Sequence, residues 1–153
     1  MFQRIQSVYL ILAIILMSSL LFFDLACISK SYDCLIINIY GVYLRKVDGL
    51  IFQNPLIALL ILYIITELAL VTSLFSFKKR MFQLRICGIN IALLSGIILM
   101  TFYLGLKIAN ESNMSFSPMP SIGCPFVAII LNILAMRRIW KDEKLVNSID
   151  RIR

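Results

Sequence analysis

The chain has 153 residues, of which 61% are hydrophobic and 15% are charged, and its formal net charge is +7. Water-soluble domains carry about 25% charged residues, so this composition argues against a soluble domain. It predicts an integral membrane protein, because a bilayer is the solvent that tolerates so much apolar surface.

Four apolar runs are long enough to cross a bilayer, which takes about 20 helical residues. They cover residues 5–23, 56–77, 86–106 and 116–136. Three prolines crowd the start of the fourth run, so its helix is expected to be short, with Pro125 in the first turn. The sequence therefore predicts an all-α integral membrane fold, with four transmembrane helices in a single domain over residues 1–153.

The segments between and after these runs have distinct patterns. Residues 24–54 form the longest connection, and its Ile-, Tyr- and Val-rich stretch, followed by the Asp48-Gly49 turn signal, predicts a small β-hairpin on the outer side. Residues 107–123 are rich in Ser, Asn and Pro, which is typical of irregular chain. Residues 137–153 are expected to extend the last helix as an amphipathic cytoplasmic tail.

Two pairs of short echoes indicate a 2+2 hairpin repeat. Residues 1–5 and 81–86 begin with Met-Phe-Gln and open the helices expected for the first and third runs. Residues 55–58 and 125–128 begin with Pro and open the helices expected for the second and fourth. Two hairpins of the same orientation would form a parallel repeat, a device that some transporters use. Chance resemblance between apolar segments explains the echoes equally well.

The distribution of basic residues predicts the orientation, because Lys and Arg near the ends of spans resist translocation. Eleven of the 15 basic residues flank one side: Arg4, Lys78, Lys79, Arg80, Arg85, Arg137, Arg138, Lys141, Lys144, Arg151 and Arg153. Four flank the other side, namely Lys30, Arg45, Lys46 and Lys107. Both termini are therefore expected in the cytoplasm. Since topology accounts for the positive charge, no nucleic-acid partner is expected, and the basic side can serve anionic lipid or a protein partner.

The first run is expected to remain as an anchor. The alternative is a lipoprotein signal cleaved before Cys27. Asp24 stands where such a signal has an aliphatic residue, so cleavage is not favoured.

No enzymatic activity and no cofactor are expected. The chain has no His, which removes the usual catalytic base and the commonest metal ligand. Its four Cys residues contain no CxxC pair, and there is no Gly-rich phosphate loop.

Cys27 and Cys34 are candidates for a disulfide, since both fall in the outer connection and enclose a short loop. Two alternatives stay open, namely unpaired thiols at the membrane surface and a thiol-redox centre. Redox chemistry would be better served by a CxxC motif at the end of a span.

Glu67 is the candidate functional residue inside the membrane, because it lies at the middle of the second run, where a charged carboxylate is costly. Protonation or a hydrogen bond across the helices would lower that cost, and Ser95 lies at a similar depth in the third run. The carboxyl group is then either a neutral contact between helices or part of a proton or cation pathway. Asn90 and Asn132 are expected to supply further polar contacts between helices.

Three cytoplasmic stretches resemble those of a bacterial membrane protein family known as domain of unknown function 4293. They are residues 2–6 (FQRIQ) with Tyr9-Leu10, residues 77–85 (FKKRMFQLR), and residues 141–146 (KDEKLV) with residues 150–153 (DRIR). The resemblance covers the whole chain. It implies a four-span protein of the bacterial inner membrane and supplies no catalytic residues.

The expected function is that of a small accessory or scaffold subunit of a membrane complex. Its partners would be the lipid bilayer and either another membrane protein or further copies of the chain. The alternative is a small transporter or ion pathway that uses Glu67. The two differ in that a scaffold tolerates Glu67→Gln, whereas a carrier needs the carboxyl group.

Overall fold

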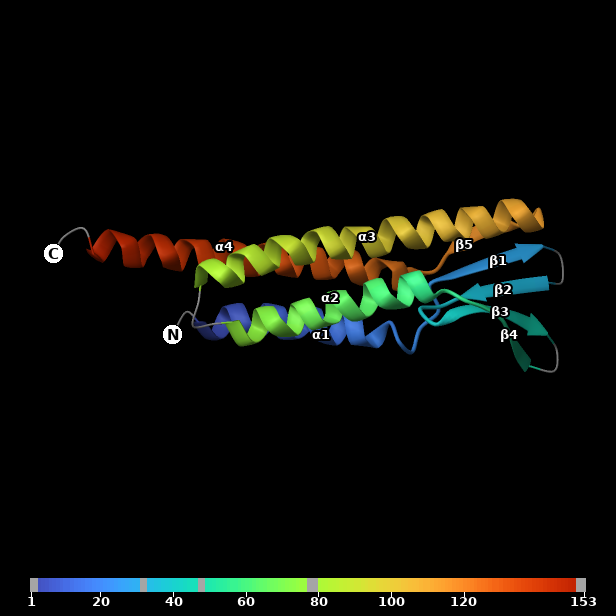
Figure 1. Cartoon of the computed structure of the whole chain (residues 1–153), viewed down its shortest axis with the longest axis horizontal. Helices are drawn as coiled ribbons and strands as arrows, with labels where there is room; N and C mark the ends of the chain where they lie inside the picture. The colour runs from blue at the N-terminus through green and yellow to red at the C-terminus, as the bar shows by residue number, and fades with distance from the viewer. Residues whose placement is uncertain (1–2, 31–32, 47–48, 77–79, 151–153) are drawn as a thin grey trace.

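The computed structural model describes residues 3–30, 33–46, 49–76 and 80–150, which form helices at one end of an elongated molecule and a β-sheet at the other (Figure 1). The helices are α1 (Gln3–Ser19), α2 (Ile57–Phe75), α3 (Arg80–Ser112) and α4 (Gly123–Asp150), and a short 3-10 helix, η2 (Pro120–Ile122), precedes α4. The strands are β1 (Ala26–Lys30), β2 (Asp33–Ile37), β3 (Gly41–Lys46), β4 (Gly49–Pro55) and β5 (Ser115–Pro118).

Three of the described helical segments are long and apolar enough to cross a bilayer: Ile57–Phe75, Met81–Ser112 and Pro120–Asp142. The first helix is shorter. Leu20, Leu21 and Phe22 bond back to the third residue before them, which ends α1 in a tight turn. At 1.5 Å per residue the 17 residues of α1 extend about 26 Å, less than the roughly 30 Å of a hydrocarbon core. The prediction of four transmembrane helices, with the first over residues 5–23, is therefore wrong.

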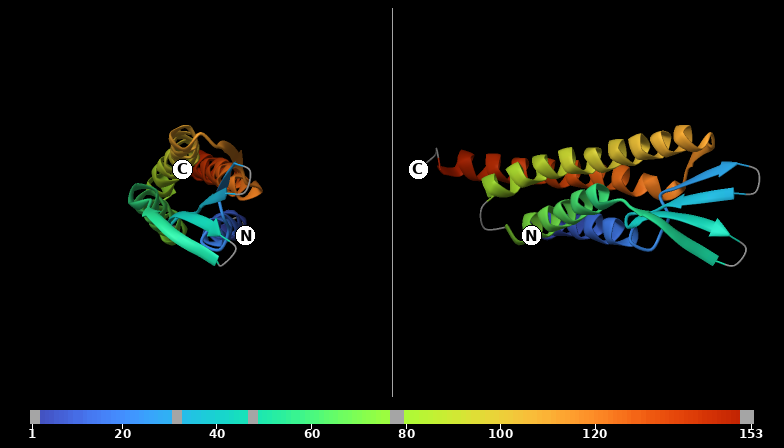
Figure 2. Two further views of the ribbon diagram at one scale, coloured as in Figure 1. Left: turned by 90° about the vertical axis from the view of Figure 1, so that its right-hand side faces the viewer. Right: turned by 45° about the vertical axis from the view of Figure 1, so that its right-hand side comes forward.

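The four helices pack side by side in a ring. Helices α1 and α3 each contact both α2 and α4, and the view along the helices in Figure 2 shows the same order. Large apolar side chains cover the outside of the ring; Leu68 of α2 and Leu99 of α3 are 62% and 70% exposed. Polar side chains lie inside, and the buried ones on the helices are Gln6, Thr66, Ser73, Gln83, Asn90, Thr101 and Asn132. This distribution is typical of helices surrounded by lipid.

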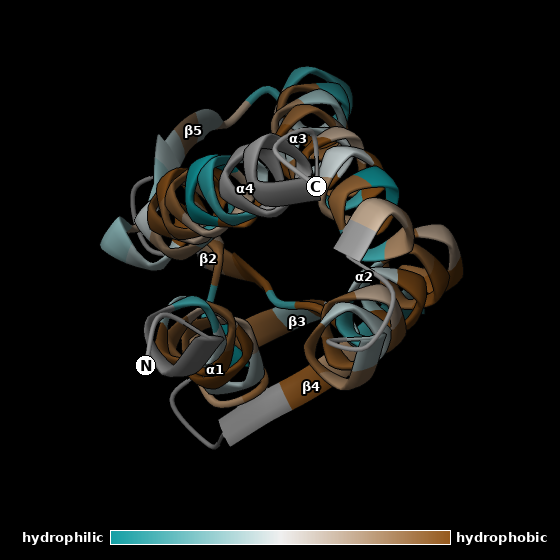
Figure 3. Cartoon of the chain, turned by 90° about the vertical axis from the view of Figure 1, so that its left-hand side faces the viewer, coloured by the Kyte–Doolittle hydropathy of each residue, from teal (hydrophilic) through white to brown (hydrophobic). Residues whose placement is uncertain are grey.

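Hydropathy colouring supports the same interpretation. Figure 3 views the ring from the end that holds both termini, and hydrophobic residues recur along all four helices. Of the large exposed apolar side chains, Ile15 of α1 and Ile130 of α4 face outward, as they would toward acyl chains.

The strands form one antiparallel sheet in the order β4-β3-β2-β1-β5. Alternate side chains of its central strands pack on α3, which continues past the other helices along the sheet (Figure 1). That core contains Ala26, Ile28, Leu35, Ile37, Val42 and Ala109. Just beyond the end of α3, Asn113 adopts a φ of 52°, a left-handed conformation that Asn tolerates, and the chain turns into β5.

The all-α prediction is wrong because of this sheet. Residues 24–54 were expected to hold a hairpin at most, but they form four strands. Residues 107–123, expected to be irregular, contain the end of α3 and all of β5, so residues 116–118 are strand and not the start of the fourth span. Strands β1 and β5 lack a local strand pattern. They are held by partners distant in sequence, as in the pair Ile28 and Phe116.

Candidate functional site

Glu67 lies near the middle of α2, and only one of its two carboxyl oxygens has a hydrogen-bond partner. Its Oε1 accepts a 2.8 Å hydrogen bond from Ser18 Oγ of α1. Its Oε2 is buried and has no hydrogen-bond partner. Ser95, which the sequence suggested as a partner, bonds instead to the backbone oxygen of Ala92 in its own helix, at 2.7 Å. The structure therefore brings Glu67 together with α1 and not with Ser95.

Two asparagines inside the ring carry further polar atoms without partners. Asn90 of α3 and Asn132 of α4 are both 0% exposed. Asn90 Nδ2 donates a 3.3 Å bond to the backbone oxygen of Ala69, whereas Asn90 Oδ1 and both polar atoms of the Asn132 side chain have no partner. An unsatisfied buried polar group costs about 1–3 kcal/mol, so a group of them requires an explanation.

From the sequence, both asparagines were expected to make polar packing contacts between helices, and neither was a candidate functional residue. The signal that could have found them is their residue type, because Asn has both a donor and an acceptor to satisfy and finds few partners in a hydrocarbon layer. Only the packing shows that these amide groups are left unsatisfied.

Cys27 and Cys34 form a disulfide between β1 and β2, with their Cα atoms 6.5 Å apart. Cys27 stands opposite Ile36 and Cys34 opposite Ser29, so the bond crosses the strand pair diagonally. Because the closed loop is the hairpin itself, the disulfide holds the two strands in register. The other two cysteines, Cys87 and Cys124, are free.

Strand β4 forms one edge of the described sheet, and apolar side chains lie on it. Ile51 and Phe52 are 49% and 50% exposed. The Phe52 ring packs edge-to-face against Tyr43 of β3, with ring centroids 5.2 Å apart. An edge strand also leaves one row of backbone N–H and C=O groups unpaired, which makes it a template for another chain.

Basic residues gather at the opposite end of the molecule, beside both termini (Figure 1). Arg85, Arg137, Arg138 and Lys141 are exposed there, and Arg4, Arg80 and Lys144 lie in the helices α1, α3 and α4. Lys78, Lys79, Arg151 and Arg153 lie outside the described residues. Helices α1 and α4 are joined at this end by a 2.7 Å bond from Gln6 Nε2 to Asp142 Oδ2.

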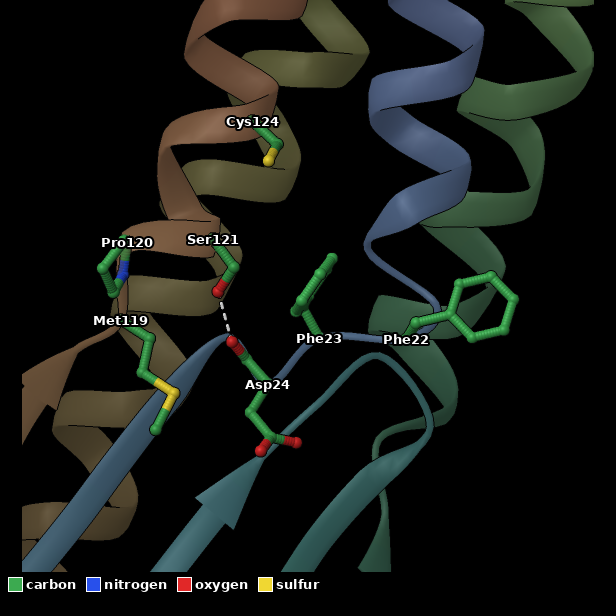
Figure 4. A pocket seen from close by; sticks show the side chains of 7 residues that line it. All are labelled: Phe22, Phe23, Asp24, Met119, Pro120, Ser121 and Cys124. Carbon is green, nitrogen blue, oxygen red and sulfur yellow. Dashed lines mark hydrogen bonds between the residues drawn. The ribbon is translucent and has the colours of Figure 1, made fainter.

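A pocket of about 490 Å³ opens where the helices meet the sheet (Figure 4). Its lining residues are Phe22, Phe23, Asp24, Met119, Pro120, Ser121 and Cys124. Ser121 Oγ donates a hydrogen bond to the backbone oxygen of Asp24, which ties η2 to the segment after α1. Phe22 points away from the other lining side chains and is 86% exposed, so the pocket is open and offers mainly apolar contact.

The described part of the chain shows no candidate metal site. There, no group of three or more Cys, Asp and Glu side chains is arranged to hold a metal ion. The chemistry available is hydrogen bonding inside the ring, apolar contact at the β4 edge, and positive charge at the end with the termini.

These features define a membrane protein in which apolar helices enclose polar side chains and carry a disulfide-linked sheet at one end. The chain belongs to the family described as Domain of unknown function (DUF4293), whose model matches residues 2–152. That match confirms the resemblance seen in the sequence. No curated protein matches the chain.

Proposed function

We propose that this protein is a non-enzymatic accessory or scaffold subunit of a membrane complex, and that its partner binds at the β4 edge of the sheet. The supporting observation is the exposure of Ile51 and Phe52 on a strand whose outer backbone groups are unpaired. Exposed apolar groups beside free backbone donors and acceptors favour the addition of a strand from another chain.

The rest of the sheet favours this role because it holds the edge in place. The disulfide between Cys27 and Cys34 joins two of the central strands, and Ala109 of α3 packs into the sheet core. A surface already rigid before binding loses less conformational entropy when a partner docks.

The proposed setting is a bacterial inner membrane, which the chain crosses more than once, with the basic end and both termini in the cytoplasm. Two observations support it. Most of the basic residues in the described part of the chain lie toward the end that holds the termini, as the positive-inside rule requires. The disulfide lies at the other end, where an oxidising compartment would preserve it.

Site-specific photocrosslinking in intact cells tests the proposal. A photoreactive residue at Phe52 should give a discrete protein adduct, whose mass separates a second 17.5 kDa copy from a different partner. Two matched positions serve as controls: Ser117 on the opposite sheet edge, and Leu99, which lies on the outside of the helices. A discrete adduct from Phe52 alone supports the proposal. No adduct, or equal adducts from all three positions, contradicts it.

A proton or cation pathway through Glu67 is the second candidate, and the unpartnered Oε2 is the observation in its favour. Purified protein in liposomes under an imposed proton or cation gradient separates the two candidates. Flux that disappears in a well-folded Glu67→Gln variant would make the protein a carrier. An absence of flux in both proteins would leave the scaffold function as the proposal.

A further inference from the structure

Asn90 and Asn132 are each flanked along their helix by residues of the same two apolar clusters. On α3, Asn90 stands about one turn from Cys87 and one turn from Leu94. On α4, Asn132 stands about one turn from Ala135 and one turn from Ala128. Cys87 and Ala135 belong to one apolar cluster, and Leu94 and Ala128 belong to another. Because α3 and α4 pack against each other, both amides occupy the layer between these clusters.

This layer is polar, and its side-chain hydrogen bonding is incomplete. Both asparagines are 0% exposed, and three of their four side-chain polar atoms have no partner. The atoms are two acceptors, Asn90 Oδ1 and Asn132 Oδ1, and one donor group, Asn132 Nδ2. Buried amides in native proteins are almost always satisfied by protein or by ordered water.

The donor and acceptor set indicates the chemistry of the occupant. A bare cation would satisfy the two oxygens but would be repelled by the N–H groups of Asn132. An anion would accept hydrogen bonds from the N–H groups of Asn132 but would be repelled by the two oxygens. Water donates and accepts at once and commonly forms about three hydrogen bonds in buried sites. We infer that Asn90 and Asn132 form a buried binding site for ordered water inside the ring of helices.

This inference goes beyond the scaffold proposal and does not depend on it, since the β4 edge and the asparagine layer are separate parts of the molecule. It also places water in the same helical interior as Glu67, without requiring that the carboxyl group conduct.

Solid-state NMR of the full chain in lipid bilayers tests the site through magnetisation transfer from water to side-chain amides. Uniform nitrogen labelling makes all of the compared amides visible. Leu131-Asn132 is the one Leu-Asn pair in the sequence, so a second sample with carbonyl-labelled Leu and nitrogen-labelled Asn identifies the backbone amide of Asn132, from which its side-chain amide is assigned. Exposed Asn110 is the reference for rapid transfer. The backbone amide of Leu94, buried one turn from Asn90, is the reference for slow transfer.

The expected result is transfer to the Asn90 and Asn132 side chains nearly as early as to Asn110 and well before Leu94. Transfer as slow as that of Leu94 would overturn the inference, because it would mean that the two amides are dry or bonded to each other. In Asn132→Leu, early transfer to Asn90 should be lost, because the shared site no longer has the polar side-chain atoms of Asn132. Unchanged transfer to Asn90 in that variant would contradict a shared site. The wild-type measurement remains decisive if the variant does not fold.

Discussion

Ser18 Oγ donates a 2.8 Å hydrogen bond to Glu67 Oε1 and so links α1, the shortest of the four helices, to the middle of α2. One turn earlier on α2, the Tyr63 hydroxyl donates a 3.1 Å bond to the backbone oxygen of Met17. Hydrogen bonds of this kind between membrane helices are worth about 1 kcal/mol each. Together these two hydrogen bonds hold α1 in the ring. The bond from Ser18 therefore gives Glu67 a structural role that requires neither proton nor cation transfer.

Conservative changes at this contact should therefore be mild. Glu67→Gln keeps the size of the side chain and an oxygen that can accept from Ser18, so the free energy of unfolding should change by about 1 kcal/mol or less. Ser18→Ala removes the donor and should cost about 1 kcal/mol. Thermal unfolding in mild detergent measures both. Glu111→Gln is the control, because the 3.9 Å ion pair of Glu111 with Lys107 is exposed to solvent and such pairs contribute little to stability. If Glu67→Gln lowered the free energy of unfolding by several times this amount, Glu67 would contribute more to stability than this one hydrogen bond.

Glu67→Lys should behave differently from Glu67→Gln. It places a cation near the middle of a membrane helix, at an insertion cost of roughly 3 kcal/mol. The described residues of α2 offer it no other acidic side chain. The variant should fail to accumulate in the membrane fraction. Normal abundance and a normal melting temperature would show that Glu67 faces water.

The disulfide should stabilise the sheet without acting in redox chemistry. Closing a loop with a sequence separation of 7 residues is worth about 2 kcal/mol in the chain-entropy model. The double variant Cys27→Ser, Cys34→Ser should lower the free energy of unfolding by about that amount, and reductant should have the same effect on the wild type. An electron-transfer activity that vanished in a folded, abundant double variant would disprove the structural role.

Gly105 of α3 should not tolerate a side chain, because a Cβ atom there would lie 2.2 Å from Cε2 of Phe116 in β5. Gly105→Ala should therefore cost about 1–3 kcal/mol through overpacking. Gly88→Ala on the same helix meets nothing within 4 Å and is the matched control, expected to be close to neutral. Melting temperatures of the two variants test this packing of β5 on α3, and equal melting temperatures would count against it.

Orientation can be tested with reporter fusions. A cytoplasmic reporter should be active when fused after Lys79 or after Arg153, and a periplasmic reporter when inserted within residues 31–48. The reason is the concentration of Lys and Arg at the end that holds the termini. A cytoplasmic signal from residues 31–48 would reverse the proposed orientation.

Sequence patterns identified the helices better than the sheet. The apolar runs at residues 56–77 and 86–106 correspond to α2 and to most of α3, because helical hydrogen bonds are local and a run of apolar residues is enough to indicate a span. Strand β1 has the sequence Ala-Cys-Ile-Ser-Lys and β5 has Ser-Phe-Ser-Pro, and neither shows a strong local preference for strand. Their pairing depends on bringing Ile28 beside Phe116.

The sequence by itself determined the membrane class, the family and the asymmetry of charge, because hydrophobicity and charge are properties of single residues that add along the chain. Only the tertiary structure decided which polar groups meet. Depth in the membrane made Ser95 a candidate partner for Glu67, but the rotation of each helix brings Ser18 to the carboxyl group and leaves Ser95 bonded to Ala92. Depth follows from position along a helix, whereas contact also depends on which faces of two helices pack together, and that is set by the whole ring.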